Sequence, residues 1–370
     1  MESFSSNKKG RIALTILLLA AMLFVRTVFY KTLFVMLLFV LWRKPLMARL
    51  PEHYRKWTAR AVWICLILTL WIALPRWRVH THDRVQLIYL NKEGTVRHAP
   101  VSHWLASAVL PESEIVNFGI TGVRIATLFG YHTDNSIVRM AQDDIKSWKI
   151  GNFFKPYYNL GFNNPICGVY SQLFNDNLGT DHTAVYICRP KHYNREESYP
   201  LVVFCHGFLG NWQLYQGIWK DFDNAIVLSI GSHGLNGIFS DKDIDRIFSF
   251  YIPALERMGY HIDNKQIHLI GLSNGGSAVN VAMRPGRSSK FKSITSISCN
   301  LGTLQKTPCR VNLVGGGKDG SAMRMPQQCQ ALKNMGVDAA LFFVQKENHF
   351  ILVNQRKEMM AFLKQRMMLE

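Results

Sequence analysis

Short apolar runs alternate with stretches of helical spacing from residue 183 onward. Apolar runs without polar alternation are typical of strands in a parallel sheet that helices cover on both faces. Helical periodicity predicts covering helices over 243–260, 323–336 and 353–367, the first with a kink at Pro253. We therefore predict an α/β fold whose parallel strands are joined by right-handed crossovers. The predicted strands lie at 183–190, 199–207, 224–231, 266–272, 291–300, 309–320 and 338–350.

The N-terminal part of the chain is far more apolar. Residues 12–42 carry only two charged side chains, and residues 61–74 carry none. A helix needs roughly 20 apolar residues to cross a bilayer, so the first run is long enough for one tilted helix or for two short ones. We expect a transmembrane anchor over 1–78, with membrane segments at about 12–42 and 57–77. A cleaved signal peptide is the weaker interpretation, because no clear small-residue cleavage site follows the first run.

The formal net charge of +18 supports this expectation, because more than half of the excess of Lys and Arg lies within residues 1–78. Basic residues beside apolar helices contact anionic headgroups, so membrane lipids are the expected partner of these N-terminal helices. Basic residues flank the first run on both sides, which leaves open the side of the membrane that carries the rest of the chain. No compact basic and aromatic motif indicates nucleic-acid binding, and the seven cysteines form no zinc pattern.

Residues 79–182 predict little beyond a strand at 85–90. The stretch 153–174 is rich in aromatic and turn residues, which suits either a hydrophobic core or a lid over a pocket. We interpret 79–182 as an N-terminal extension or accessory region, and 183–370 as a domain of its own.

The sequence Gly-Leu-Ser-Asn-Gly at 271–275 lies where a predicted strand gives way to a helix-like run. It fits the Gly-x-Ser-x-Gly pattern of a nucleophile elbow, a sharp turn that lifts a serine hydroxyl above the carboxyl edge of a sheet. Gly271 and Gly275 leave room for the strained backbone of Ser273. A turn without chemistry is the alternative, but the mechanism requires a strand before the serine and a helix after it. We therefore predict that Ser273 is a nucleophile.

A serine hydroxyl is a weak nucleophile near neutral pH and needs an adjacent base. His349 is the one histidine after Ser273, and it follows the last predicted strand. The base needs a carboxylate to orient it, and Asp319 follows the preceding strand. Asp338 lies at the opposite end of a strand, and Glu347 is too close to His349 along the chain. Ser273, Asp319 and His349 form the predicted triad, although an aspartate before glycine is also an ordinary turn residue.

Acyl transfer also requires preplaced N–H donors for the developing oxyanion. One expected donor is the backbone amide of Asn274, directly after the serine. The other is the amide of Phe208, in the loop after the strand 199–207, where Gly207 allows the turn. We expect His206 to hold this loop by hydrogen bonds and not to act as a base.

These residues resemble the α/β-hydrolase superfamily. "YPLVVFCHGF", "IHLIGLSNGG", "VGGGKD" and "ENHF" match its third strand, elbow, acid loop and histidine loop in order. The elbow is similar to those of the esterase and depolymerase branches, and somewhat similar to that of prolyl-oligopeptidase-type peptidases. The resemblance covers residues 183–370 and implies an α/β-hydrolase fold that hydrolyses carboxylic esters through an acyl-enzyme, with no metal or organic cofactor. The chain departs from the pattern in "HGFLGN", where many lipase-type esterases have a glycine-rich loop, and in residues 79–182, which match no part of it.

The sequence therefore predicts a membrane-anchored serine hydrolase whose substrate is a small-molecule or lipid-like acyl ester. Two alternatives stay open. A serine peptidase would use the same triad and would prefer peptide amides to short acyl esters. An idle hydrolase fold would serve as a membrane-tethered binding protein and would not react with a fluorophosphonate.

Overall fold

The computed structural model describes residues 8–25, 28–73, 81–82, 84–97, 182–207, 214–232 and 238–369, together with the single positions 121, 125 and 211. The chain divides into two compact units, Met1–Arg76 with Ser107–Tyr157 and Trp77–Ala106 with Tyr158–Glu370. Most of the predicted accessory region, including the aromatic stretch 153–174, lies outside the described residues.

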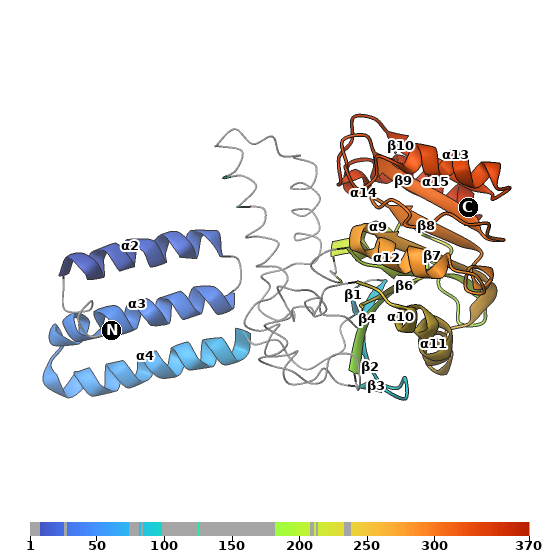
Figure 1. The fold of residues 1–370 in the computed structure, drawn as a ribbon. Coiled ribbons are helices and arrows are strands. Elements are labelled where there is room, and N and C mark those ends of the chain that lie inside the picture. The colour runs from blue at the N-terminus through green and yellow to red at the C-terminus, as the bar shows by residue number, and fades with distance from the viewer. Residues whose placement is uncertain are drawn as a thin grey trace. The chain divides into compact units, whose positions relative to one another are not determined.

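Three helices make up the described N-terminal part of the first unit (Figure 1). They are α2 (Lys8–Phe24), α3 (Val28–Ala48) and α4 (Glu52–Ala73). Trp42 on α3 donates its indole N–H to the hydroxyl of Thr15 on α2 at 2.7 Å. The ring of Phe39 on α3 packs edge-on against Trp63 on α4, with 5.7 Å between the ring centroids. These contacts hold the three helices side by side.

The prediction of membrane segments at 12–42 and 57–77 is not supported. In the described part of the chain, no helix is both long enough and apolar enough to cross a membrane. The first run is divided between two helices, and α2 has 17 residues where roughly 20 are needed. The longer helices include charged residues, which lower their mean hydropathy: Lys31, Arg43 and Lys44 in α3, and Glu52, Arg55, Lys56 and Arg60 in α4. The lipid contacts predicted for this segment therefore have no support from its helices.

The described residues of the second unit form one sheet of ten strands, which Figure 1 shows with its strands labelled. The strand order is β1-β2-β4-β6-β5-β7-β8-β9-β10, and β3 pairs with β2 outside this path. The strands from β6 to β10 in that order are parallel to one another, whereas β4 is antiparallel to both β2 and β6. The bounds are β1 (Thr81–His82), β2 (Val85–Asn91), β3 (Val96–Arg97), β4 (His182–Cys188), β5 (Tyr199–Cys205), β6 (Ile226–Ile230), β7 (Ile262–Leu272), β8 (Ser293–Ile297), β9 (Arg310–Gly316) and β10 (Ala339–Val344).

The predicted strands are confirmed, and so is the mostly parallel sheet. The sheet, however, begins well before residue 183. Strand β2 pairs with β4 along its whole length, from Val85 opposite Cys188 to Asn91 opposite His182. A division of the chain at residue 183 therefore separates strands that are hydrogen-bonded to one another.

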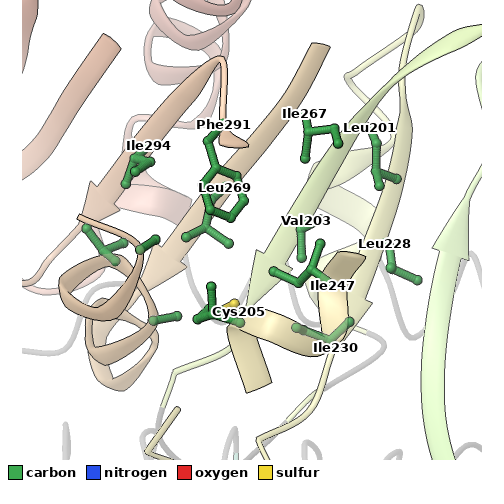
Figure 2. Close-up of a cluster of buried hydrophobic side chains, with 14 of the residues drawn as sticks. Leu201, Val203, Cys205, Leu228, Ile230, Ile247, Ile267, Leu269, Phe291 and Ile294 are labelled. Carbon is green, nitrogen blue, oxygen red and sulfur yellow. The ribbon is translucent and has the colours of Figure 1, made fainter. Parts of the chain in front are cut away.

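Helices cover both faces of the sheet. On one face lie α10 (Asp241–Arg246), α11 (Ile252–Arg257), α12 (Gly276–Ala282) and α13 (Met325–Asn334). Figure 2 shows part of the core beneath them, where the alternate residues Leu201, Val203 and Cys205 of β5 pack with Leu269 of β7. The three β5 side chains share this face because alternate side chains of a strand point the same way, and all four residues are 0% exposed.

The opposite face is covered by α9 (Leu214–Trp219) and α15 (Arg356–Met367). Here the ring of Phe204 on β5 lies 4.7 Å from that of Trp219 on α9, between ring centroids. Likewise, the ring of Phe342 on β10 lies 5.7 Å from that of Phe362 on α15. The predicted two-sided covering of the sheet is therefore confirmed.

The irregularity predicted at Pro253 is a π-helical turn. Residues Ile247–Tyr251 form this turn between α10 and α11, and Pro253 lies in the first turn of α11. Proline lacks a backbone N–H, and its ring would clash with the carbonyl group four residues earlier in a regular helix. The wider turn relieves both problems.

A buried histidine in β7 makes the stability of this fold depend on pH. His268 is 0% exposed. Its Nδ1 pairs with the hydroxyl of Ser293 at 2.8 Å, while its Nε2 has no hydrogen-bond partner among the described residues. Burial lowers the pKa of His268 from 6.5 to about 4.

The free energy of unfolding should therefore decrease as the pH falls from 6.5 to about 4, because the unfolded chain binds a proton that folded His268 does not. The expected slope from this one group is about 1 kcal/mol per pH unit. Urea denaturation of the wild type and of His268→Gln at several pH values measures it, with the exposed His261→Gln as the control. Equal slopes for the wild type and His268→Gln would rule out this role for His268.

Candidate active site

The predicted elbow is a strand-to-helix turn. Strand β7 ends at Leu272, a 3₁₀ turn spans Ser273–Gly275, and α12 begins at Gly276. Ser273 has a φ of 52°, in the left-handed region that residues other than glycine rarely adopt. Strained backbone of this kind is concentrated at functional sites, because it costs free energy that the surrounding structure must supply.

Two glycines allow the turn to pack this tightly. A Cβ on Gly271 would lie 2.7 Å from the carbonyl carbon of Gly275 and 2.8 Å from the side chain of Val279. A Cβ on Gly275 would lie 2.8 Å from the carbonyl carbon of Cys205, at the end of β5. Real Cβ atoms do not approach other atoms so closely, so both positions require glycine.

The structure brings the three predicted triad side chains together. Nε2 of His349 lies 2.9 Å from the hydroxyl oxygen of Ser273, and its Nδ1 lies 3.0 Å from Oδ2 of Asp319. An ionised carboxylate can only accept hydrogen bonds, so Nδ1 carries the proton and donates it to Asp319. Nε2 is then the acceptor for the hydroxyl of Ser273, which is the arrangement of a serine with its base.

Backbone hydrogen bonds between two loops explain this convergence. The acid loop follows β9, and the histidine loop follows β10. Lys318 N–H donates to the carbonyl of Glu347 at 2.8 Å, and Gly317 N–H donates to that of Val344 at 3.1 Å. The side chain of Asp319 is only 4% exposed, whereas that of His349 is 39% exposed. The carboxylate is thus shielded from water while the imidazole remains accessible.

The two other acids in this part of the sequence are engaged elsewhere. Asp338 accepts hydrogen bonds from Arg310 at 3.1 Å and from Arg366 at 2.6 Å, at the opposite edge of the sheet. Glu347 accepts hydrogen bonds from the side-chain amides of Asn354 and Gln355 at 2.9 and 2.7 Å. Neither carboxylate orients the histidine.

His206 lies fully buried at the end of β5. Its Nε2 faces the backbone N–H of Ser232 at 3.4 Å, and its Nδ1 faces the carbonyl of Gly207 at 2.7 Å. The N–H must donate to Nε2, so Nδ1 carries the proton and donates to the carbonyl. Burial lowers the pKa of His206 to about 4, which keeps it neutral near neutral pH. Both ring nitrogens are therefore hydrogen-bonded to backbone groups, as expected for a residue that supports this loop.

The loop after β5 lies against the serine. A Cβ on Gly207 would be 3.4 Å from Cβ of Ser273 and 3.5 Å from the hydroxyl of Tyr215 on α9. Phe208, whose amide is the second predicted oxyanion donor, lies outside the described residues. Asn274, the first predicted donor, is the second residue of the 3₁₀ turn.

Sequence reasoning missed two polar residues at this site. Tyr215 is one, and no local pattern in the sequence places its hydroxyl beside Gly207. Ser321 is the other, and its hydroxyl donates to Asp319 Oδ1 at 2.6 Å. The local sequence Asp-Gly-Ser carried a signal here, because an aspartate often accepts a hydrogen bond from the residue two positions later.

In the described part of the chain, no group of His, Cys, Asp and Glu side chains is arranged to hold a metal ion.

In this site a strained serine lies at a strand-to-helix turn, and an acid and then a histidine follow it along the chain at the same edge of the sheet. This is the arrangement found in α/β-hydrolases. With its mostly parallel sheet and its helices on both faces, the second unit has this fold.

No protein-family model matches the chain, and no curated protein matches it. Solved structures with similar backbones include an acylaminoacyl peptidase from Pyrococcus horikoshii, with 14% identity over 50% of this chain and 40% of that one and a TM-score of 0.38. An esterase from Pyrobaculum calidifontis has 16% identity over 50% of this chain and 81% of its own, with a TM-score of 0.40. A ferulic acid esterase has 17% identity over 53% of this chain and 95% of its own, with a TM-score of 0.44. Likenesses this distant carry no information about activity.

Proposed function

We propose that this chain is a serine hydrolase that cleaves carboxylic esters through an acyl-enzyme. The observation that supports the proposal is the continuous chain of hydrogen bonds from Asp319 through His349 to Ser273, with distances of 3.0 and 2.9 Å. It gives the serine a base, and it gives the base a carboxylate that fixes its tautomer. The 39% exposed imidazole leaves room for a substrate to approach.

In the first half of the proposed reaction, the Ser273 hydroxyl attacks the acyl carbonyl carbon while Nε2 of His349 takes its proton. The carbonyl oxygen becomes an oxyanion, and the backbone amide of Asn274, in the 3₁₀ turn that precedes α12, donates to it. A second donor is expected from the amide of Phe208. His349 then gives its proton to the leaving alcohol, and the acyl group stays on the serine.

In the second half, water replaces the alcohol. His349 takes a proton from water as it attacks the acyl-enzyme, and returns a proton to Ser273 as the carboxylic acid leaves. Asp319 stays ionised throughout and stabilises the imidazolium that forms twice in each cycle.

Three exposed apolar residues are linked to this site through neighbouring residues of the chain, and they favour an apolar acyl group. Ile238, Met323 and Phe350 are 43%, 58% and 48% exposed. Phe350 directly follows His349, and Met323 lies in the loop of Asp319, two residues beyond Ser321. The residue after Ile238 donates its N–H to the hydroxyl of Ser277 on α12 at 2.8 Å. A small-molecule or lipid-like acyl ester could bury part of this apolar surface on binding.

A panel of p-nitrophenyl esters of increasing acyl length, with a matched peptide p-nitroanilide, tests the proposed substrate class. We expect kcat/KM to rise with acyl length. Met323→Ser should lower kcat/KM for the longer esters by about tenfold, because it removes apolar contact with the chain. Met335→Ser is the matched control, since Met335 is exposed directly after α13, and the length of that helix separates it from the loop of Asp319. Faster cleavage of the anilide than of every ester would instead indicate a peptidase.

A further inference from the structure

Ser321 makes a dense set of contacts beside the proposed triad. Its hydroxyl lies 2.6 Å from Oδ1 of Asp319 and 2.8 Å from the carbonyl oxygen of Ser298. Its backbone N–H donates to the same Oδ1 at 2.9 Å. The hydroxyl also lies 3.2 Å from Nδ1 of His349. One serine therefore touches both groups that would activate Ser273.

The directions of these hydrogen bonds follow from the chemistry of the partners. Both the Asp319 carboxylate and the Ser298 carbonyl are acceptors, so the single hydroxyl proton of Ser321 serves one of them at a time, and the shorter distance is to Asp319. Nδ1 of His349 carries a proton, so the Ser321 oxygen can accept from it alongside Oδ2 of Asp319.

These contacts divide the two carboxylate oxygens of Asp319 between two tasks. Oδ1 accepts from the amide and the hydroxyl of Ser321, while Oδ2 accepts from His349. A carboxylate held at only one oxygen can rotate about its terminal bond, because that torsion is broad. Two donors on Oδ1 oppose the rotation and keep Oδ2 directed at the imidazole.

A second serine ties the histidine loop to the same position. The hydroxyl of Ser298 donates to the backbone carbonyl of His349 at 3.0 Å. Ser298 has a φ of 53°, at the end of β8, which is strained for a residue other than glycine. Its own carbonyl lies 2.8 Å from the hydroxyl of Ser321. The end of β8 thus contacts the acid loop and the histidine loop at once.

We propose that Ser321 is a positioning residue of this site, whose hydroxyl fixes the Asp319 carboxylate in the orientation that His349 requires. The inference rests on the proposed function. Ser321 itself is exposed, so its substitution should change the stability of the fold little.

The test compares Ser321→Ala with Ser321→Thr, which keeps a hydroxyl. For a p-nitrophenyl ester, Ser321→Ala should lower kcat about tenfold and leave KM unchanged, because a hydrogen bond to a charged group is lost without loss of substrate contacts. Ser321→Thr should restore most of the activity. Ser289→Ala, at an exposed serine whose hydroxyl lies 3.5 Å from the carbonyl of Gly286, is the control.

A second readout does not depend on activity. In the proton NMR spectrum, the Nδ1–H resonance of His349 should shift in Ser321→Ala and return in Ser321→Thr. An unchanged resonance together with wild-type kcat in Ser321→Ala would overturn the positioning role and leave the proposed hydrolase intact. If the wild type cleaves no ester, the proposed function fails, and the resonance alone decides whether Ser321 orients this pair.

Discussion

Ser273→Ala should lower kcat for ester hydrolysis by about five orders of magnitude. The substitution removes the only atom proposed to form the acyl-enzyme, and the fold should stay intact because alanine fits the space of serine. Initial rates with a p-nitrophenyl ester, together with thermal unfolding of the purified variant, measure both effects.

A double variant sharpens this prediction. Residues that act as one catalytic unit give strongly non-additive losses, so Ser273→Ala/His349→Ala should be no less active than Ser273→Ala. Losses that multiply in the double variant would mean that the two side chains act independently, contrary to their 2.9 Å contact. Substantial remaining activity in Ser273→Ala would point to a different nucleophile.

Asp319→Asn should lower kcat by about three to four orders of magnitude. The asparagine side chain has nearly the same shape, but its amide group can turn a donor toward Nδ1 of His349. That donor would favour the tautomer with the proton on Nε2, which cannot accept a proton from Ser273. The exposed Glu358→Gln on α15 is the matched control for removing a negative charge. An Asp319→Asn variant within about tenfold of the wild type would exclude the proposed role of this carboxylate.

Local sequence patterns predicted the parallel part of the sheet well. Strands such as Tyr199–Cys205 are buried on both faces and form short, continuous apolar runs that are visible in the sequence. The elbow could also be predicted from a local pattern. Its glycines at 271 and 275 are required by close contacts within a few residues and with the end of β5. The meeting of Asp319 and His349 followed from one general rule, that parallel strands end at the same edge of the sheet.

Contacts between distant segments were not predictable in the same way. The pairing of β2 with β4 joins strands separated by about ninety residues of sequence, and no local pattern records it. Tyr215 is much closer in sequence to Gly207, but no local pattern records that α9 brings the two together. The apolar content of 12–42 suggested a membrane anchor of one tilted helix or two short ones. The run does divide between α2 and α3, but no described helix is both long enough and apolar enough to cross a membrane.

The most direct measurement is the reaction of the purified chain with a fluorophosphonate, followed by mass spectrometry of its peptides. Such a reagent phosphonylates only a serine that an adjacent base has activated. We expect one adduct, on Ser273, and none in Ser273→Ala or His349→Ala. A folded wild-type chain that forms no adduct, or that forms it on another residue, would show that the hydrogen bonds among Ser273, His349 and Asp319 do not make an active nucleophile.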